Sequence, residues 1–238
     1  MITFKRDEFY AHPSADMEGD SSLGNRLFMI ASTIGIAVKN GYEYGFPEWS
    51  NQRFFVNPLP KIEEKEFEPF NIDWGFHGFD VPDNVAIYGY LQSPKYFEHC
   101  MDIIRHYFTM NYQVEPIKGA ILIHYRAYYE LLYGVLFKEL ARKYFKAAIK
   151  QMPQLPVVVI TDNILRARNC IGEGFEYVSN TAIKDFYLLC NADYIVGSNS
   201  TFSAMAAILA GVPAVFPRKW FANGQSAKDI YSKDWIIL

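Results

Sequence analysis

Cysteine is scarce in this 238-residue chain, and its three cysteines are far apart. Cys100, Cys170 and Cys190 form no C-x-x-C pair, so the sequence indicates neither a zinc ribbon nor a disulfide framework. The sequence also lacks an apolar signal segment at its N-terminus and any run approaching the roughly 20 apolar residues that span a bilayer. We therefore expect a cytoplasmic protein with separate, reduced thiols and no transmembrane segment.

An excess of basic residues is missing as well. Lys and Arg together number 23, against 26 for Asp and Glu, which gives a net charge of −3. A nucleic-acid-binding protein normally carries a basic excess, so this class of partner is not expected. Aromatic residues, in contrast, make up 17% of the chain, a density that suits a ring-lined cleft and a thick core equally well.

The common nucleotide- and metal-binding motifs are absent too. No G-x-G-x-x-G or Walker A loop occurs, so the usual dinucleotide-binding and P-loop classes are excluded. No H-x-x-x-H or D-x-D pattern occurs either, which argues against a metal-dependent sugar transferase. We therefore expect no metal site and no resident cofactor.

The second half of the chain alternates short apolar runs with segments of helical spacing. We expect strands at residues 120–124, 157–161, 175–178, 193–197 and 212–216. Helices are expected in a long stretch after the first of these strands, to about residue 151, and over 181–191 and 201–210. Such an alternation predicts an α/β protein with a parallel sheet wrapped by helices.

The first half is less regular. Apolar spacing predicts a helix over 23–39, a strand over 85–91 and a helix over 94–108, whereas segment 61–82, punctuated by Pro and Gly, is expected to be a loop. The polar segment 111–118 is a candidate boundary between two domains, which are then residues 1–113 and 114–238.

Three polar groups follow predicted strands of the second half. They are His124-Tyr125-Arg126, Thr161-Asp162-Asn163 and Ser198-Asn199-Ser200-Thr201. Ligands of an open parallel sheet bind beyond the carboxyl ends of its strands, so we expect these groups at one edge. Ser200 and Thr201 open a helix, where hydroxyls, N–H groups and the helix dipole suit a phosphate. Arg126 offers a bidentate fork for the same anion, and Asp162 can accept two N–H groups from a base such as guanine.

Each group also has a plain structural interpretation. Residues 198–201 can be a helix cap, Asp162 and Asn163 can be a turn and cap, and His124 with Arg126 can be a surface ion-pair site. The convergence of all three groups on one edge favours a nucleotide or nucleotide-sugar site.

The start of the first helix is a further candidate. Gly24 and Asn25 stand where this helix begins, and Gly24 permits a ligand to approach the backbone closely. The alternative is an ordinary helix start.

Seven segments stand out in order along the chain. They are LGNRLFMIA (23–31), GYLQSPKYF (89–97), ILIHYR (121–126), YFKAAI (144–149), VITDN (159–163), IKDFYLLCNADYIVGSNSTFSAMAAILAG (183–211) and FPRKWF (216–221). Together they resemble the α-1,2-fucosyltransferase family (glycosyltransferase family 11-like) and related GDP-fucose-dependent transferases. The most specific piece is NADYIVGSNSTFS, and the chain resembles a short, divergent member.

The resemblance implies a GT-B-like fold of two Rossmann-like domains with parallel sheets. It also implies a metal-independent, inverting transfer of fucose from GDP-fucose, the nucleotide-sugar donor, to a hydroxyl of a glycan acceptor. Residues 1–113 would form the acceptor-side domain and residues 114–238 the donor-binding domain. Gly24 and Asn25 would close over the donor diphosphate from the first domain.

The same resemblance assigns roles in the second domain. Arg126 would hold the donor diphosphate, His124 would lie against the nucleotide, and Asp162 would read guanine. Ser200 and Thr201 would bind phosphate oxygens. These roles fit the chemistry, because a fixed cation and helix N–H groups can stabilise the charge that develops on a departing diphosphate.

One departure from the family pattern concerns the catalytic base. Where the family usually has H-x-R-x-G-D, this chain reads HYRAYY at 124–129, so the glycine and the acid are missing and Glu130 stands one position late. An acid in this loop is a natural base for the acceptor hydroxyl, so Glu130 is the candidate that acts together with Arg126. The other candidates are Asp16, Glu18 and Asp20.

Another departure concerns the sugar pocket. The segment SAM at 203–205 stands where the family commonly has Ser-Trp-Trp, which indicates an altered sugar or acceptor pocket. Tyr125, Tyr128 and Tyr129 are candidate sugar-stacking rings. Two alternatives stay open: a related transferase that uses another nucleotide-sugar donor, and a non-catalytic module that binds a nucleotide sugar.

Overall fold

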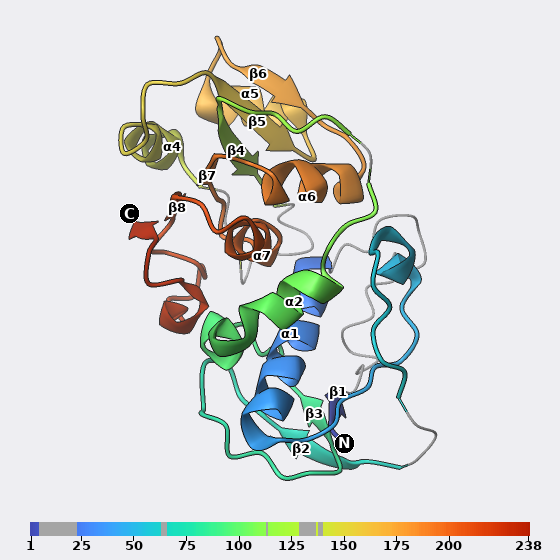
Figure 1. Ribbon diagram of the computed structural model, residues 1–238. Coiled ribbons are helices and arrows are strands. Elements are labelled where there is room, and N and C mark those ends of the chain that lie inside the picture. The colour runs from blue at the N-terminus through green and yellow to red at the C-terminus, as the bar shows by residue number, and fades with distance from the viewer. Residues whose placement is uncertain (5–22, 63–65, 113, 129–136, 138–139) are drawn as a thin grey trace. The chain divides into compact units, whose positions relative to one another are not determined.

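The chain divides into two compact units, Met1–Gln113 and Val114–Leu238, in the computed structural model (Figure 1). The structure describes residues 1–4, 23–62, 66–112, 114–128, 137 and 140–238. Each unit contains its own sheet, and the strands described in both sheets pair in parallel. The α/β class and the GT-B-like pair of parallel-sheet units that the sequence predicts are therefore confirmed.

The second unit is built on a six-stranded sheet with the strand order β6-β5-β4-β7-β8-β9. The strands are β4 (Ile121–Tyr125), β5 (Val157–Thr161), β6 (Glu176–Val178), β7 (Tyr194–Val196), β8 (Ala214–Phe216) and β9 (Ile236–Ile237). The first five match the expected apolar runs, and β4 is wholly buried because both faces of a parallel sheet are covered. The sequence pattern does not predict β9, because two residues carry no periodicity.

Helices cover both faces of this sheet. They are α4 (Arg142–Ile149), α5 (Ile164–Ile171), α6 (Ala182–Cys190) and α7 (Thr201–Ala210). α4 packs against α5, and α6 lies beside α7 (Figure 1). The chain runs outward from β4 through α4 and α5 to β6, returns through α6 to β7, and continues the other way through α7 to β8. Because such crossovers are right-handed, the two helix pairs cover opposite faces of the sheet.

The prediction of a long helix directly after β4 is wrong for the described residues. Residues 126–128 are irregular, because the N–H groups of Arg126 and Ala127 donate to side chains of other segments rather than to helical carbonyls. The helix α4 begins only at Arg142. Long-range hydrogen bonds therefore override the helical spacing of this segment.

The first unit has a three-stranded sheet with the order β1-β3-β2, formed by β1 (Thr3–Phe4), β2 (Glu68–Asn71) and β3 (Val85–Tyr88). The expected first helix is confirmed as α1 (Leu23–Asn40), and most of it is buried because the majority of its residues are apolar. β2 lies within segment 61–82, so the expectation of a loop there is wrong for β2. Its side chains are mostly exposed and show no apolar alternation.

The helix expected over 94–108 is broken into η3 (Pro94–Tyr96), η4 (Glu98–Cys100) and α2 (Met101–Tyr107). Phe97 interrupts it with φ −134° and ψ 0°, which are not helical values. At this break the backbone of Tyr96 approaches α1 at Gly35, where a Cβ atom would lie 2.0 Å from the Tyr96 carbonyl oxygen. Close packing on α1 accounts for the interruption.

Two further short 3₁₀ helices are η2 (Ser50–Phe54) and η5 (Lys228–Ile230). Within the described ranges, no helix combines the length and the apolar character needed to cross a membrane.

Candidate functional site

The carboxyl ends of β4 and β7 lie side by side at the point where the strand order of the second unit reverses. Ile123 of β4 pairs with Val196 of β7, but the connections that leave the two strands lead to opposite edges of the sheet. Open α/β sheets bind ligands in the crevice at such a point. The segments that follow the two strands, residues 126–128 and 197–201, therefore lie at the natural binding crevice of this unit.

Ser198 joins these two segments. Its hydroxyl donates to the His124 carbonyl at 2.7 Å and accepts the Arg126 N–H at 3.1 Å. The residue is 2% exposed, so this hydroxyl serves the structure rather than a ligand. Ser198 consequently fixes the end of β4 beside the start of α7.

The start of α7 is not closed by a side-chain cap. Ser200 is the N-cap residue, and its hydroxyl makes no capping hydrogen bond, so the helix-cap interpretation is wrong for Ser200. The first N–H groups of a helix have no acceptor within the helix, and the dipole favours an anion there. Ser200 and Thr201 thus begin a ten-residue helix with the properties of a phosphate site.

Arg126 and Asp162 form an ion pair across the ends of β4 and β5. Nη1 of Arg126 contacts Oδ2 of Asp162, and the Ala127 N–H donates to Oδ1 of Asp162 at 3.0 Å. Both carboxylate oxygens are therefore engaged. The ion pair uses only Nη1 of a guanidinium that has five N–H donors, and the Arg126 side chain is 29% exposed. Arg126 can thus still offer N–H groups to an anion.

Asn163 caps α5. Its Oδ1 accepts the Arg166 N–H at 3.0 Å, and its own N–H donates to Oγ1 of Thr161 at 3.0 Å. The cap interpretation of this turn is confirmed for Asn163, whereas Asp162 is engaged with the segment after β4.

His124 is a buried, neutral side chain at the end of β4. It is 6% exposed, and its ring stacks on Phe202 of α7 with centroids 5.1 Å apart. Its Nδ1 has no hydrogen-bond partner among the described residues. Burial, together with the nearby charge of Arg126, lowers the pKa of His124 to about 3. At neutral pH the imidazole can therefore give a ligand one donor or one acceptor nitrogen but no charge.

Asp185 of α6 is a candidate that the motif analysis does not assign. It is 7% exposed, and its Oδ1 accepts the side-chain amide of Asn180 at 2.8 Å. Desolvation raises the pKa of Asp185 to about 6, although the hydrogen bonds from Asn180 oppose this, and the charge of Asp162 raises it further. Carboxylates with raised pKa values cluster at functional sites. The sequence signal is a single acid within the otherwise apolar segment 185–190.

Gly24 and Asn25 occupy the first turn of α1 in the first unit. Oδ1 of Asn25 accepts the side-chain amide of Gln92 at 2.9 Å, and Gln92 is 6% exposed. The preceding Leu91 has φ +49°, a left-handed value that is uncommon for leucine. A strained segment therefore packs against this helix start, and the role of Gly24 and Asn25 toward a diphosphate stays a prediction.

The remaining predicted site residues have different outcomes. Glu130, Asp16, Glu18, Asp20 and Tyr129 lie outside the described residues. Tyr125 is wrong as a sugar-stacking ring: it is 1% exposed in the core, because neighbouring side chains of a strand point to opposite faces. Tyr128 is 8% exposed and donates its hydroxyl to the Asn199 carbonyl at 2.7 Å. Ala204 and Met205 are fully buried, so they contribute to the core.

Comparison with solved structures finds related folds. A point mutant of FUT1 from Arabidopsis thaliana in complex with GDP matches with a TM-score of 0.52 and 13% identity, covering 85% of this chain and 72% of that one. The fucosyltransferase NodZ from Bradyrhizobium matches with a TM-score of 0.47 and 14% identity, covering 79% and 89%. NodZ α-1,6-fucosyltransferase soaked with GDP-fucose matches with a TM-score of 0.46 and 14% identity, and the match covers 78% of this chain and 88% of that one. No family model and no curated protein sequence matches the chain. At these identities the likeness to FUT1 shows the fold alone.

Proposed function

We propose that the protein is a glycosyltransferase that moves fucose from GDP-fucose to a glycan hydroxyl, as in the α-1,2-fucosyltransferases that its motifs resemble. The observation that carries the proposal is the grouping of His124, Arg126 and the start of α7 at the strand-order reversal of the second unit. The fold shared with FUT1 supports it. The donor-binding residues of this proposal are Gly24, Asn25, His124, Arg126, Asp162, Ser200 and Thr201.

The proposed transfer breaks the bond between C1 of the sugar and the β-phosphate oxygen, and the electron pair of that bond leaves with GDP. Arg126 and the N–H groups at the start of α7 stabilise the charge that develops on the diphosphate. The acceptor oxygen attacks C1 from the opposite face, so the configuration at C1 inverts. Glu130 is the proposed base that takes the proton of the acceptor hydroxyl.

Two roles compete for Asp162 within this proposal. Reading guanine requires its carboxylate oxygens to be available to the base. Since these oxygens are engaged by Arg126 and by the Ala127 N–H, we assign Asp162 the role of positioning Arg126 toward the diphosphate. The two roles differ in a measurable way, because only the reading of guanine discriminates between nucleotide bases.

Calorimetric titration with GDP, UDP and ADP tests donor binding. GDP is expected to bind most tightly. Arg126→Ala is expected to weaken GDP binding by about 10- to 100-fold, because hydrogen bonds to a charged group contribute about 1.5–3 kcal/mol. Arg168→Ala is the matched control, since Arg168 is an exposed arginine in the last turn of α5 and is expected to leave GDP binding unchanged. A protein that binds none of the three nucleotides at millimolar concentration would contradict the proposal.

Transfer itself is measured with a panel of labelled nucleotide sugars and oligosaccharide acceptors. Fucose transfer that is lost in a folded Arg126→Ala variant supports the proposed enzyme and excludes a non-catalytic module. Transfer from a different nucleotide sugar would identify the alternative donor.

A further inference from the structure

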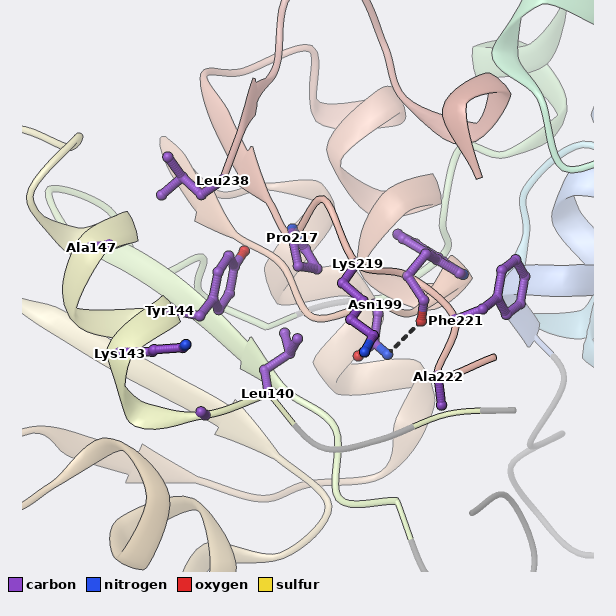
Figure 2. Close-up of a pocket in the computed structure, with 12 residues that line it drawn as sticks. Leu140, Lys143, Tyr144, Ala147, Asn199, Pro217, Lys219, Phe221, Ala222 and Leu238 are labelled. Carbon is purple, nitrogen blue, oxygen red and sulfur yellow. Dashed lines mark hydrogen bonds between the residues drawn. The ribbon is translucent and has the colours of Figure 1, made fainter. Parts of the chain in front are cut away.

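A second candidate binding site lies on the α4 side of the second unit (Figure 2). It is a cavity of about 560 Å³, here called the α4 cavity, and this size falls within the range of roughly 300–1,000 Å³ that is typical of small-molecule sites. Its walls include Leu140, Tyr144, Ala147, Pro217, Trp220 and Phe221. The cavity adjoins the crevice at Asn199, but none of the donor-binding residues proposed in the second unit is among its described lining residues.

Two polar side-chain groups in the cavity wall are already paired within the protein. The Tyr144 hydroxyl donates to the Gly197 carbonyl at 2.7 Å, and the Asn199 side-chain amide donates to the Trp220 carbonyl at 2.9 Å, the dashed line in Figure 2. A sugar or a base in this cavity would bury polar groups with few partners, at a cost of about 2–7 kcal/mol for each group. The part of a ligand that enters the cavity is therefore apolar.

Positive charge borders the cavity. Lys143 and Lys219 carry the charged side chains among the described lining residues, and no described lining side chain is acidic. Both lysines are exposed, and neither forms an ion pair with a described carboxylate. Charge complementarity therefore selects an anionic head group.

We propose that the α4 cavity binds a single-chain amphiphile, which is an alkyl chain with an anionic head group. The chain lies among Tyr144, Trp220 and the apolar walls, and the head group contacts Lys143 and Lys219. This proposal does not rest on GDP-fucose transfer. Asn199 belongs both to the cavity wall and to the segment that precedes α7, so an occupant of the cavity contacts the loop of the crevice.

Titration with decyl phosphate below its micelle concentration tests the proposal, with Trp fluorescence and calorimetry as readouts. Decyl phosphate is expected to bind saturably at one site. Decanol, which lacks the charge, is expected to bind about tenfold more weakly, and inorganic phosphate is not expected to bind measurably. Equal affinities for decanol and decyl phosphate, or the absence of saturable binding, would overturn the proposal.

Two variants locate the ligand. Ala147→Phe fills the cavity and is expected to weaken decyl phosphate binding by more than about 20-fold, whereas Lys146→Phe places the same ring on α4 at a position that does not line the cavity. The double variant K143M/K219M is expected to weaken decyl phosphate about tenfold and to leave decanol unchanged, while K146M/K150M changes neither. Unaltered decyl phosphate binding by K143M/K219M overturns the proposal even where Ala147→Phe does not fold.

Vesicles distinguish the source of the ligand. Binding to vesicles that contain lysophosphatidylglycerol, an anionic lipid with a single chain, identifies a membrane lipid as the occupant when the binding is lost in Ala147→Phe. Binding to decyl phosphate without binding to vesicles identifies a free amphiphile. Both results support an anionic alkyl ligand in the α4 cavity.

Discussion

Arg126 is held by side chains that are remote from it in the sequence. Its N–H is bound by Ser198 after β7, and its guanidinium is bound by Asp162 after β5. The ion pair fixes the direction of the fork before any ligand arrives, so less side-chain freedom is lost when an anion binds. Preorganisation of this kind is the role that we propose for Asp162.

Asp162→Asn separates positioning from base recognition. Since a neutral amide holds a guanidinium less firmly, the variant is expected to weaken GDP, UDP and ADP binding by one common factor of about three to ten. Calorimetry with the three nucleotides measures this factor. Asp193→Asn is the control, because Asp193 pairs with Lys118 and the Gly119 N–H at the other end of the sheet. A loss confined to GDP would instead show that Asp162 reads guanine.

Asp185 makes the stability of the second unit depend on pH. Its pKa rises from 3.8 in the unfolded chain to about 6 in the folded one, so between these values the folded state binds more protons and stability falls as pH rises. Asp185→Asn cannot ionise and still accepts a hydrogen bond from Asn180. The variant is expected to be more stable than the wild type by about 2–3 kcal/mol at pH 7.5 and by much less at pH 4.

Urea unfolding of both proteins at the two pH values measures this difference. Asp193→Asn is expected to change stability in the opposite direction, because hydrogen bonds from Gly119 and Lys118 lower the pKa of Asp193. A stability difference between Asp185→Asn and the wild type that is the same at both pH values would show that Asp185 ionises normally.

At the element scale, the spacing of apolar residues is sufficient to predict a helix whose position depends on its own residues. The helices expected over 23–39, 181–191 and 201–210 are found within one residue of these bounds at each end. The pattern fails where contacts with segments distant in the sequence determine the backbone conformation, as at Phe97 and in residues 126–128.

The same distinction applies to the candidate site. The rule for parallel sheets places Arg126, Asp162 and the start of α7 at one edge. The Arg126–Asp162 ion pair and the bridge made by Ser198 depend on the register between strands, and no local pattern carries that information. The burial of Tyr125 depends on which face of β4 each side chain occupies.

Gly35 allows α1 to pack closely against the backbone of Tyr96 and Phe97. A Cβ atom there would lie 2.0 Å from the Tyr96 carbonyl oxygen and 2.8 Å from Cα of Phe97, and these backbone atoms cannot rotate away. Gly35→Ala is therefore expected to destabilise the protein by about 1–3 kcal/mol, although Ala normally favours a helix. Thermal unfolding measures the change, with the partly exposed Val38→Ala on the same helix as a control expected within about 0.5 kcal/mol of the wild type. Equal stability of Gly35→Ala and the wild type would contradict this packing.

At the scale of the whole molecule, the proposed donor site draws residues from both units. Hydrogen exchange tests this, because the N–H groups at helix starts lack internal acceptors and exchange readily without a ligand. GDP is expected to slow exchange at Phe202 and Ser203 in the first turn of α7 and at Gly24 in the first turn of α1, while β2 serves as an internal reference that does not change. Protection confined to residues 114–238 would contradict the proposed role of Gly24 and Asn25 and would leave donor binding by the second unit intact.

The parallel pairing of β4 with β7 has a consequence for the order in which the protein can form. Ile121 pairs with Val157 on one side and with Tyr194 on the other, so β4 is an edge strand until a much later part of the chain is available. Closing so long a connection costs chain entropy before any contact is gained, which slows folding. During synthesis, a nascent chain that ends before Val196 can form the β4–β5 pair but cannot contain the crevice. The edge of the second unit that we propose to bind the donor is therefore assembled late, because its strands are synthesised far apart in time.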